Sequence, residues 1–305
     1  MNDTYRIRAG RRTLEVHRPD KVLFAEDGGL TKADIAEYYR RIARYMVPEV
    51  KGRPLMLERH PEGIGAQPHF MQKDTPDHYP EWVHTAEVAK EGGTVRHTLC
   101  DDAATLVFLA DQACVTLHRW LSTTAHLDQP DRLVFDLDPP GHDFEAVRHA
   151  ARLTKELLDE LKLPAMLMTT GSKGLHVTVP LDGRTGFDDC RAFAKDAAEV
   201  LAARDPGRLT TAVRKDARGD RLYLDVQRNA YAQTAVAPWS VRAREGAPVA
   251  VPLTWDHLED PGLTARSWSL RDVDAIVELA ESEPWSGLGR GRSLPAARQR
   301  LDRLR

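Results

Sequence analysis

Two carboxylates stand two residues apart at the end of an apolar stretch. Asp136 and Asp138 close the segment Arg132-Leu-Val-Phe-Asp-Leu-Asp138, and Pro-Pro-Gly follows it. In a β-strand, residues i and i+2 point to the same face, so a strand here would hold both carboxylates together at its end. Adjacent anions repel each other, and Mg²⁺ or Mn²⁺ with hard oxygen ligands would relieve that repulsion. The alternative is a simple turn over residues 138–141, with Asp136 satisfied by backbone donors.

A second segment, Thr169-Thr-Gly-Ser-Lys-Gly-Leu-His-Val177, has the composition of a phosphate-binding turn. Its two glycines would let backbone amides approach a phosphate closely, and Lys173 adds a positive charge. Thr170 and His176 can each add a side-chain contact. The turn joins two expected strands, unlike a Walker A loop, which leads into a helix. The alternative is a glycine hairpin with an exposed lysine.

A third carboxylate, Asp225, stands in Leu222-Tyr-Leu-Asp-Val226, a stretch that is expected to be a strand. An acid between apolar neighbours is unusual, because a buried charge needs a compensating partner. A bound metal would supply that compensation.

The amino-acid composition is typical of a globular protein and argues against several other classes of protein. The chain has 305 residues, 42% hydrophobic and 29% charged, with a formal net charge of −3. Its three cysteines, Cys100, Cys114 and Cys190, fit neither a disulfide framework nor a zinc cluster. No apolar run approaches the roughly 20 residues of a membrane helix, and no secretory signal is visible. We therefore expect a cytoplasmic protein.

Hydrophobic periodicity predicts the elements that must position these residues. Helical spacing is expected over residues 32–47, with Thr31 as N-cap and Pro48 as its limit, and over 105–120, 144–161 and 187–203. Extended segments are expected over residues 14–17, 55–57, 64–71, 132–138, 165–169, 175–179 and 222–226. This order predicts an α+β or mixed α/β protein whose central sheet carries the chemistry at its strand ends.

The acid pair, the glycine turn and Asp225, in this order and spacing, resemble the polymerase domain of bacterial DNA ligase D, in the archaeo-eukaryotic primase superfamily. The resemblance covers roughly residues 5–280. It extends to the blocks Arg18–Phe24, Leu30–Asp34, Arg53–Phe70 and Thr234–Arg244. The Lys-x-Asp-Gly adenylation motif of a ligase is not matched, because Pro180 occupies the place of the nucleophile. The resemblance thus implies a polymerase module without a ligase, either as a stand-alone chain or as an excised domain.

What the resemblance implies for fold is a primase-polymerase architecture. It has a central, mostly antiparallel or mixed sheet that bears the active site, flanking helices and an N-terminal α/β subregion. We expect one domain over residues 1–285, with a DNA-end-binding subregion at about 1–120 and a catalytic core at about 121–285. A basic tail, 286–305, follows.

The resemblance also implies the catalytic centre. Asp136, Asp138 and Asp225 would hold two divalent cations, Mn²⁺ in preference to Mg²⁺, for in-line nucleotidyl transfer. His118, counted among the catalytic residues, would lie near the sugar and the metal site.

Nucleotide binding is implied for a second group. Thr170, Lys173, His176 and Arg242 would grip the triphosphate, and Phe70 would offer an aromatic platform for a base.

DNA binding is implied for a third group. Lys21 and Lys32 would take the 5′ phosphate of the downstream strand, with Arg18 as a further contact where relatives often carry Asn. Arg218 would guide the template or primer. Met71 stands where relatives often have a second aromatic residue, which weakens any expectation of stacking there.

The function expected is template-directed addition of nucleotides, ribonucleotides preferred, to DNA 3′ ends for gap filling in bacterial non-homologous end joining. Expected partners are DNA ends and gaps with a 5′ phosphate, NTPs or dNTPs, Ku and a separate ATP-dependent DNA ligase, near the nucleoid and away from membranes. Three alternatives stay open: a de novo primase, a metal-dependent glycosyltransferase with an Asp-x-Asp motif, and a non-catalytic DNA-end-binding module.

Overall fold

The structure is a computed structural model that describes residues 4–141, 143–288 and 291–304. The chain divides into two compact units, and each is described by itself. Unit 1 comprises residues up to Trp120 together with Thr234–Val251 and Trp268–Ser282. Unit 2 comprises Leu121–Gln233, Pro252–Ser267 and the segment from Glu283 onward. The α+β fold class is confirmed, because helices and largely antiparallel sheets occur in both units.

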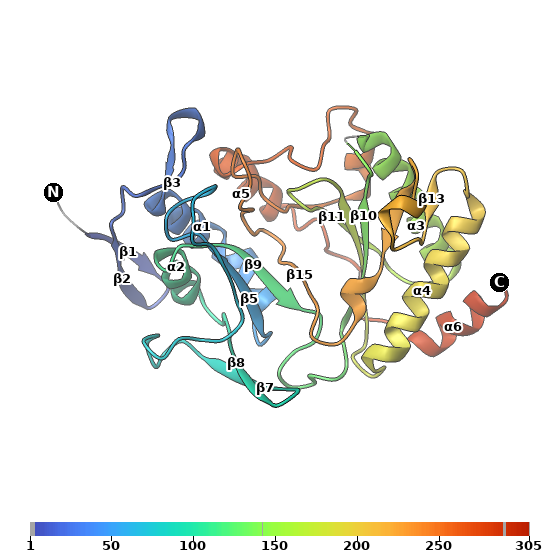
Figure 1. Ribbon diagram of the computed structural model, residues 1–305, viewed down its shortest axis with the longest axis horizontal. Coiled ribbons are helices and arrows are strands. Elements are labelled where there is room, and N and C mark those ends of the chain that lie inside the picture. Colours follow the sequence, from blue (N-terminus) through green and yellow to red (C-terminus); the bar gives the residue numbers. More distant parts are fainter. Residues whose placement is uncertain (1–3, 142, 289–290, 305) are drawn as a thin grey trace. The chain divides into compact units, whose positions relative to one another are not determined.

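Unit 1 is built on a four-stranded antiparallel sheet in the order β15-β9-β5-β6. Its strands are β15 (Thr234–Val236), β9 (Cys114–Trp120), β5 (Leu55–Arg59) and β6 (Phe70–Gln72). Three hairpins accompany it: β1 (Thr4–Ala9) with β2 (Arg12–His17), β3 (Val22–Phe24) with β4 (Leu30–Thr31), and β7 (Thr85–Lys90) with β8 (Gly93–Thr98). The α-helices of the unit are α1 (Lys32–Val50), α2 (Ala103–Asp111) and α5 (Val273–Glu281), and Figure 1 shows the elements in sequence colours.

Helix α1 begins where its capping residues predict. The Thr31 side chain accepts a hydrogen bond from the Asp34 backbone, and the Asp34 carboxylate accepts one from the Thr31 backbone, which is a capping box. Its buried face includes Ile35, Tyr39, Ile42 and Met46. The prediction that Pro48 limits the helix was wrong by about one turn, because α1 continues to Val50 with Pro48 inside it.

Unit 2 carries a six-stranded sheet in the order β13-β14-β10-β12-β11-β16. Its strands are β13 (Leu209–Thr210), β14 (Leu222–Asp225), β10 (Arg132–Asp138), β12 (Leu175–Pro180), β11 (Met166–Thr169) and β16 (Pro252–Leu253). All neighbours are antiparallel except β13 and β14. Helices α3 (Phe144–Glu160) and α4 (Phe187–Arg204) pack on each other and on β10, and α6 (Leu294–Asp302) packs on α4. Strand β10 is therefore paired on both sides and covered by helices, which gives its end a rigid support.

Short 3₁₀ helices complete the described chain. They span Glu26–Gly28, Lys215–Ala217, Gln227–Asn229, Trp255–Glu259 and Leu270–Asp272. Among the described residues, none of the helices combines the length and the apolar character that crossing a membrane requires.

The helix predicted over residues 105–120 was wrong for its second half, which is a strand. Residues 105–120 divide into the end of α2 and strand β9, separated by Ala113, whose φ of 56° lies in the left-handed region. The predicted extended segment at 64–71 is mostly turns, and only its last two residues belong to β6.

Candidate active site

The acids of β10 and β14 meet across the antiparallel ladder of unit 2. Asp136 lies directly opposite Asp225, and Asp138 lies opposite Tyr223. On its other side Asp136 lies opposite His176 of β12. Directly paired residues share a face of a sheet, and so do residues i and i+2 of one strand. The three predicted acids and His176 therefore lie on one face, which confirms that Asp136 and Asp138 project together from a strand.

Two cationic or hydrogen-bonding groups hold Asp136, which is 4% exposed. His176 Nε2 lies 3.4 Å from Asp136 Oδ1, and Arg228 Nε lies 3.4 Å from Asp136 Oδ2. Burial by itself raises the pKa of a carboxyl group, but His176 and Arg228 together hold the pKa of Asp136 below its ordinary value. Arg228 was not among the predicted site residues, since its contact with Asp136 spans 92 positions of sequence.

The pKa of Asp138 is shifted in the opposite direction to that of Asp136. Burial, followed by the negative charges of Asp136 and Asp225, raises the pKa of Asp138 to about 6. A carboxyl group whose pKa is raised this far by burial and by like charges marks a site where a cation would lower the electrostatic energy.

These oxygen donors are the type that Mg²⁺ and Mn²⁺ prefer. Within the part of the chain that the structure describes, however, no three Asp, Glu, His or Cys side chains are close enough together to hold a metal ion. Asp225 Oδ1 instead accepts a 2.8 Å hydrogen bond from the Gln227 backbone. The acids thus share a face without forming an assembled three-ligand site, and metal binding stays a prediction.

The glycine turn between β11 and β12 packs directly against the end of β10. A Cβ atom built on Gly174 would lie 1.8 Å from the Leu137 carbonyl oxygen and 3.2 Å from Asp138 Oδ1, so only glycine fits. The Thr170 hydroxyl stabilises the turn, because it donates to the Gly174 carbonyl at 3.0 Å and accepts from the Ser172 and Gly174 amides at 3.3 Å each. Lys173 is exposed at the tip. The turn is therefore held beside the acids, and its contacts with a triphosphate stay predictions.

Arg218 lies over the ring of Tyr223, with its guanidinium carbon 3.8 Å from the ring centroid. Its Nε donates to the Ala212 carbonyl at 3.0 Å, and its Nη2 donates to the Val213 carbonyl at 2.7 Å. Because Tyr223 lies opposite Asp138, this stack is next to the acids. The contact of Arg218 with DNA stays a prediction.

His118, by contrast, belongs to unit 1, in β9. Its Nε2 lies 3.8 Å from Glu58 Oε2, and His60 Nε2 lies 3.4 Å from Glu58 Oε1. Sequence reasoning missed Glu58 and His60, although both follow the apolar start of β5.

The edge strand β6 presents Phe70 and Met71 to opposite faces of its sheet. Met71 is paired with Glu58, and Phe70 with Arg59. Phe70 is 44% exposed and Met71 is 49% exposed. Phe70 is therefore accessible as an aromatic platform, whereas Met71 occupies the face that carries Glu58.

A cationic cluster gathers Arg18, Lys21 and Lys32, also in unit 1. The backbone amide of Lys32 donates to the Lys21 carbonyl at 2.9 Å. Burial lowers the pKa of Lys32, Asp111 acts in the opposite direction, and the charges of Arg18 and Lys21 lower that pKa further. Three positive groups close enough to affect one another are what a multiply charged anion would require.

Each of the two lysines already has a carboxylate partner. Lys32 Nζ donates to the Asp111 carbonyl at 2.9 Å and to Asp111 Oδ1 at 3.1 Å, and Lys21 Nζ donates to Glu62 Oε2 at 2.9 Å. Arg242, the remaining predicted phosphate ligand, is half-buried in unit 1, and its backbone amide donates to the Pro248 carbonyl at 2.7 Å.

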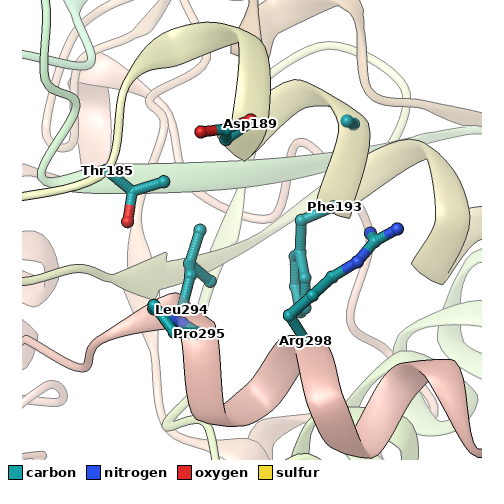
Figure 2. A pocket seen from close by; sticks show the side chains of 7 residues that line it. Thr185, Asp189, Phe193, Leu294, Pro295 and Arg298 are labelled. Atoms are coloured by element: carbon teal, nitrogen blue, oxygen red, sulfur yellow. The ribbon is translucent and has the colours of Figure 1, made fainter.

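A cavity of about 400 Å³ lies between α4 and α6, and Figure 2 shows its side chains. Its lining consists of Thr185, Asp189, Ala192, Phe193, Leu294, Pro295 and Arg298. None of the predicted site residues is among them, so this cavity is separate from the acids.

Comparison with known proteins agrees with the resemblance seen in the sequence. The family described as LigD, primase-polymerase domain, matches residues 31–285. The multifunctional non-homologous end joining DNA repair protein LigD of Mycobacterium tuberculosis is 33% identical over 291 residues, covering 90% of this chain and 38% of that protein. LigD of Pseudomonas aeruginosa is 34% identical over 277 residues, covering 90% of this chain and 33% of that protein. The chain thus spans about a third of the length of these curated relatives.

Among solved structures, the polymerase domain of Mycobacterium tuberculosis Ligase D in complex with DNA superimposes with a TM-score of 0.81. It is 31% identical, and the match covers 89% of this chain and 95% of that chain.

Proposed function

The chain belongs to the LigD primase-polymerase family, a family of nucleotidyl transferases, and we propose that it extends DNA 3′ ends during end joining. It fills gaps by template-directed addition of nucleotides and prefers ribonucleotides. The observation that carries this proposal is the single sheet face shared by Asp136, Asp138 and Asp225, with the glycine turn packed against it.

In the proposed reaction, the primer 3′ oxygen attacks the α-phosphorus of the incoming nucleotide. A new P–O bond forms, the bond to the β-phosphate breaks, and pyrophosphate leaves. Asp136, Asp138 and Asp225 would hold two divalent cations, Mn²⁺ or Mg²⁺. When bound, such a pair supplies Lewis-acid chemistry that activates the attacking hydroxyl and neutralises the leaving group.

The protein's own groups would orient the triphosphate. The amides of the turn at residues 170–174 and the Lys173 ammonium supply donors and positive charge to phosphate oxygens. His176, whose Nε2 faces Asp136, would contact the same phosphate oxygens. The roles proposed for Arg242, His118 and Phe70 are contacts with the phosphates, the sugar and a base of the nucleotide respectively.

Recognition of a broken end would rest on the cluster of Arg18, Lys21 and Lys32. A terminal phosphate carries more charge than an internal one, so converging cations favour ends over continuous duplex. Ku and an ATP-dependent DNA ligase activity are the proposed partners that this role requires for sealing. The DNA complex of the similar Mycobacterium tuberculosis domain supports DNA as the partner.

Primer extension tests the proposal directly. The substrate is a duplex with a one-nucleotide gap, a templating T and a 5′ phosphate, supplied with ATP or dATP and with Mn²⁺ or Mg²⁺. We expect single-nucleotide addition that is faster with ATP and with Mn²⁺. Extension that needs no primer would reassign the chain to de novo priming, and absence of any addition would refute nucleotidyl transfer.

A further inference from the structure

Glu58 of β5 lies close to two histidines, His118 of β9 and His60, which follows β5. Its Oε1 is 3.4 Å from His60 Nε2, and its Oε2 is 3.8 Å from His118 Nε2. The ladder explains this arrangement, since Met56 is paired with His118 and Glu58 with Thr116. Residues 56 and 58 share a face, so the Glu58 and His118 side chains are diagonal neighbours on it.

This cluster is largely removed from solvent. The exposed fraction of the side chain is 18% for Glu58, 12% for His118 and 8% for His60. Burial alone would raise the pKa of Glu58, but its interactions with His118, His60 and Thr116 hold that pKa well below its ordinary value. Glu58 is thus an ionised carboxylate, which can only accept hydrogen bonds.

A carboxylate oxygen that faces Nε2 of a neutral histidine ring favours the tautomer with the proton on Nε2. The ring carries a single N–H, and a carboxylate at Nε2 favours the form in which that nitrogen holds the proton. His60 agrees with this, because its Nδ1 is buried and has no hydrogen-bond partner among the described residues. A buried lone pair there is consistent with the proton at Nε2, next to Glu58.

We propose that Glu58 is a positioning residue that fixes the ring orientation and the Nε2-protonated tautomer of His118. The consequence for nucleotide addition rests on the proposed function, in which His118 faces the sugar of the incoming nucleotide. A ring held by a buried carboxylate loses little entropy when it contacts a ligand, whereas a free ring must be ordered first.

Histidine ¹⁵N NMR on the whole chain, without nucleotide or metal, tests the positioning independently of activity. The spectra are recorded at pH 8.5, and His118 is assigned from the signal that His118→Asn removes. We expect a single Nε2-protonated state in the wild type and in Glu58→Gln, which keeps an acceptor oxygen. In Glu58→Leu both tautomers should coexist. An Nδ1-protonated His118 in the wild type, or an unchanged spectrum in Glu58→Leu, would overturn the proposal.

Steady-state kinetics supply the functional arm. For ATP addition, Glu58→Leu should lower kcat/KM by about tenfold, the scale of one interaction with a charged group. Glu58→Gln should recover most of that loss. In a His118→Ala background, Glu58→Leu should cause no further loss, because its effect passes through His118.

Glu49→Gln is the matched control. The half-buried Glu49 carboxylate lies 2.6 Å from Nη1 of Arg119, the residue that follows His118 in β9. Its removal should leave kcat/KM and the His118 spectrum unchanged. Additive losses in the double variant would overturn the proposal and leave the proposed function intact. A wild type that adds no nucleotide would refute the proposed function, and the NMR experiment would still decide the role of Glu58.

Discussion

Asp136 of β10 lies directly opposite Asp225 of β14, although 89 positions of sequence separate the two residues. With Asp138 two residues further along β10, this register places three acids on one face of the sheet. Burial, together with repulsion from Asp136 and Asp225, raises the pKa of Asp138. A protein that keeps like charges together without enough compensating cations gives up stability, and functional sites are where such a cost is common.

Asp136→Asn and Asp138→Asn should each abolish nucleotide addition and leave DNA affinity within about twofold, because affinity comes chiefly from basic groups elsewhere. Gel-based primer extension and fluorescence anisotropy measure the two properties. Asp188→Asn, which changes an exposed acid in the first turn of α4, is the control and should retain both. Nucleotide addition by either folded active-site variant would rule out the assigned role of the acids.

Asp138→Asn should also stabilise the metal-free protein. The pKa of Asp138 in the folded protein, about 6, is higher than its ordinary value of 3.8, so the folded state holds the proton more tightly than the unfolded chain does. Stability therefore falls as the pH rises from about 4 to 6 and stays reduced above that. At pH 8 the variant should gain about 1–2 kcal/mol in the free energy of unfolding, allowing for solvent screening.

Urea denaturation in EDTA measures this gain at pH 8 and at pH 4.5. At the lower pH Asp138 is protonated in the folded wild type but largely ionised in the unfolded chain, so the difference between the two proteins should shrink to about a third of its value at pH 8. A variant that is less stable than the wild type at pH 8 would contradict the electrostatic explanation.

Gly174→Ala should both destabilise unit 2 and impair nucleotide addition. The added methyl group would collide with the Leu137 carbonyl, and backbone on both sides leaves little room to adjust. Overpacking of this kind costs about 1–3 kcal/mol. Gly141→Ala is the matched control, since a Cβ at Gly141 meets nothing within 4 Å. Equal urea midpoints for the two variants would show that the turn does not pack as described.

Local sequence signals were enough for the elements around the acids. Strand β10 spans Arg132–Asp138 as predicted, and α3 and α4 end within one residue of the predicted limits. The prediction at residues 105–120 failed for a physical reason. Strand β9 is buried on both faces, so it lacks alternation, and Val107, Ala110, Cys114 and Leu117 follow one another at helical spacing. The turn at Ala113 uses a left-handed residue that is neither glycine nor asparagine, and nothing in the sequence indicates it.

Contacts set by strand register could not be predicted in the same way. Arg228 reaches Asp136 because a 3₁₀ helix at Gln227–Asn229 follows β14, and Glu58 reaches His118 because β5 and β9 are paired. Each contact depends on which strands are neighbours, and a single sequence without its fold does not contain that information. The family resemblance was enough to select His118 as a site residue, but its neighbour Glu58 could be found only from the structure.

The last prediction concerns the 5′ phosphate, and the structure decides which lysine should be changed. Removing the Lys32 side chain would break the buried ion pair with Asp111, which is 8% exposed and would keep only its weaker hydrogen bonds, such as those with the His17 amide and ring. The loss of such a partner costs about 3–5 kcal/mol of stability, which would obscure any effect on binding. Lys21 pairs instead with Glu62, whose side chain is 53% exposed and can return to water.

Lys21→Ala should therefore weaken binding to a gapped duplex with a 5′ phosphate by roughly tenfold, the effect of one hydrogen bond to a charged group. Binding to the same duplex with a 5′ hydroxyl should stay within about twofold, because the remaining phosphates are contacted elsewhere. Lys90→Ala, at the exposed end of β7, is the control for the general loss of one positive charge, and it should affect both duplexes equally. Fluorescence anisotropy on the matched pair of duplexes gives the ratio directly. If the wild type binds both duplexes equally, the cluster of Arg18, Lys21 and Lys32 is not a phosphate site, and end recognition must come from another part of the chain.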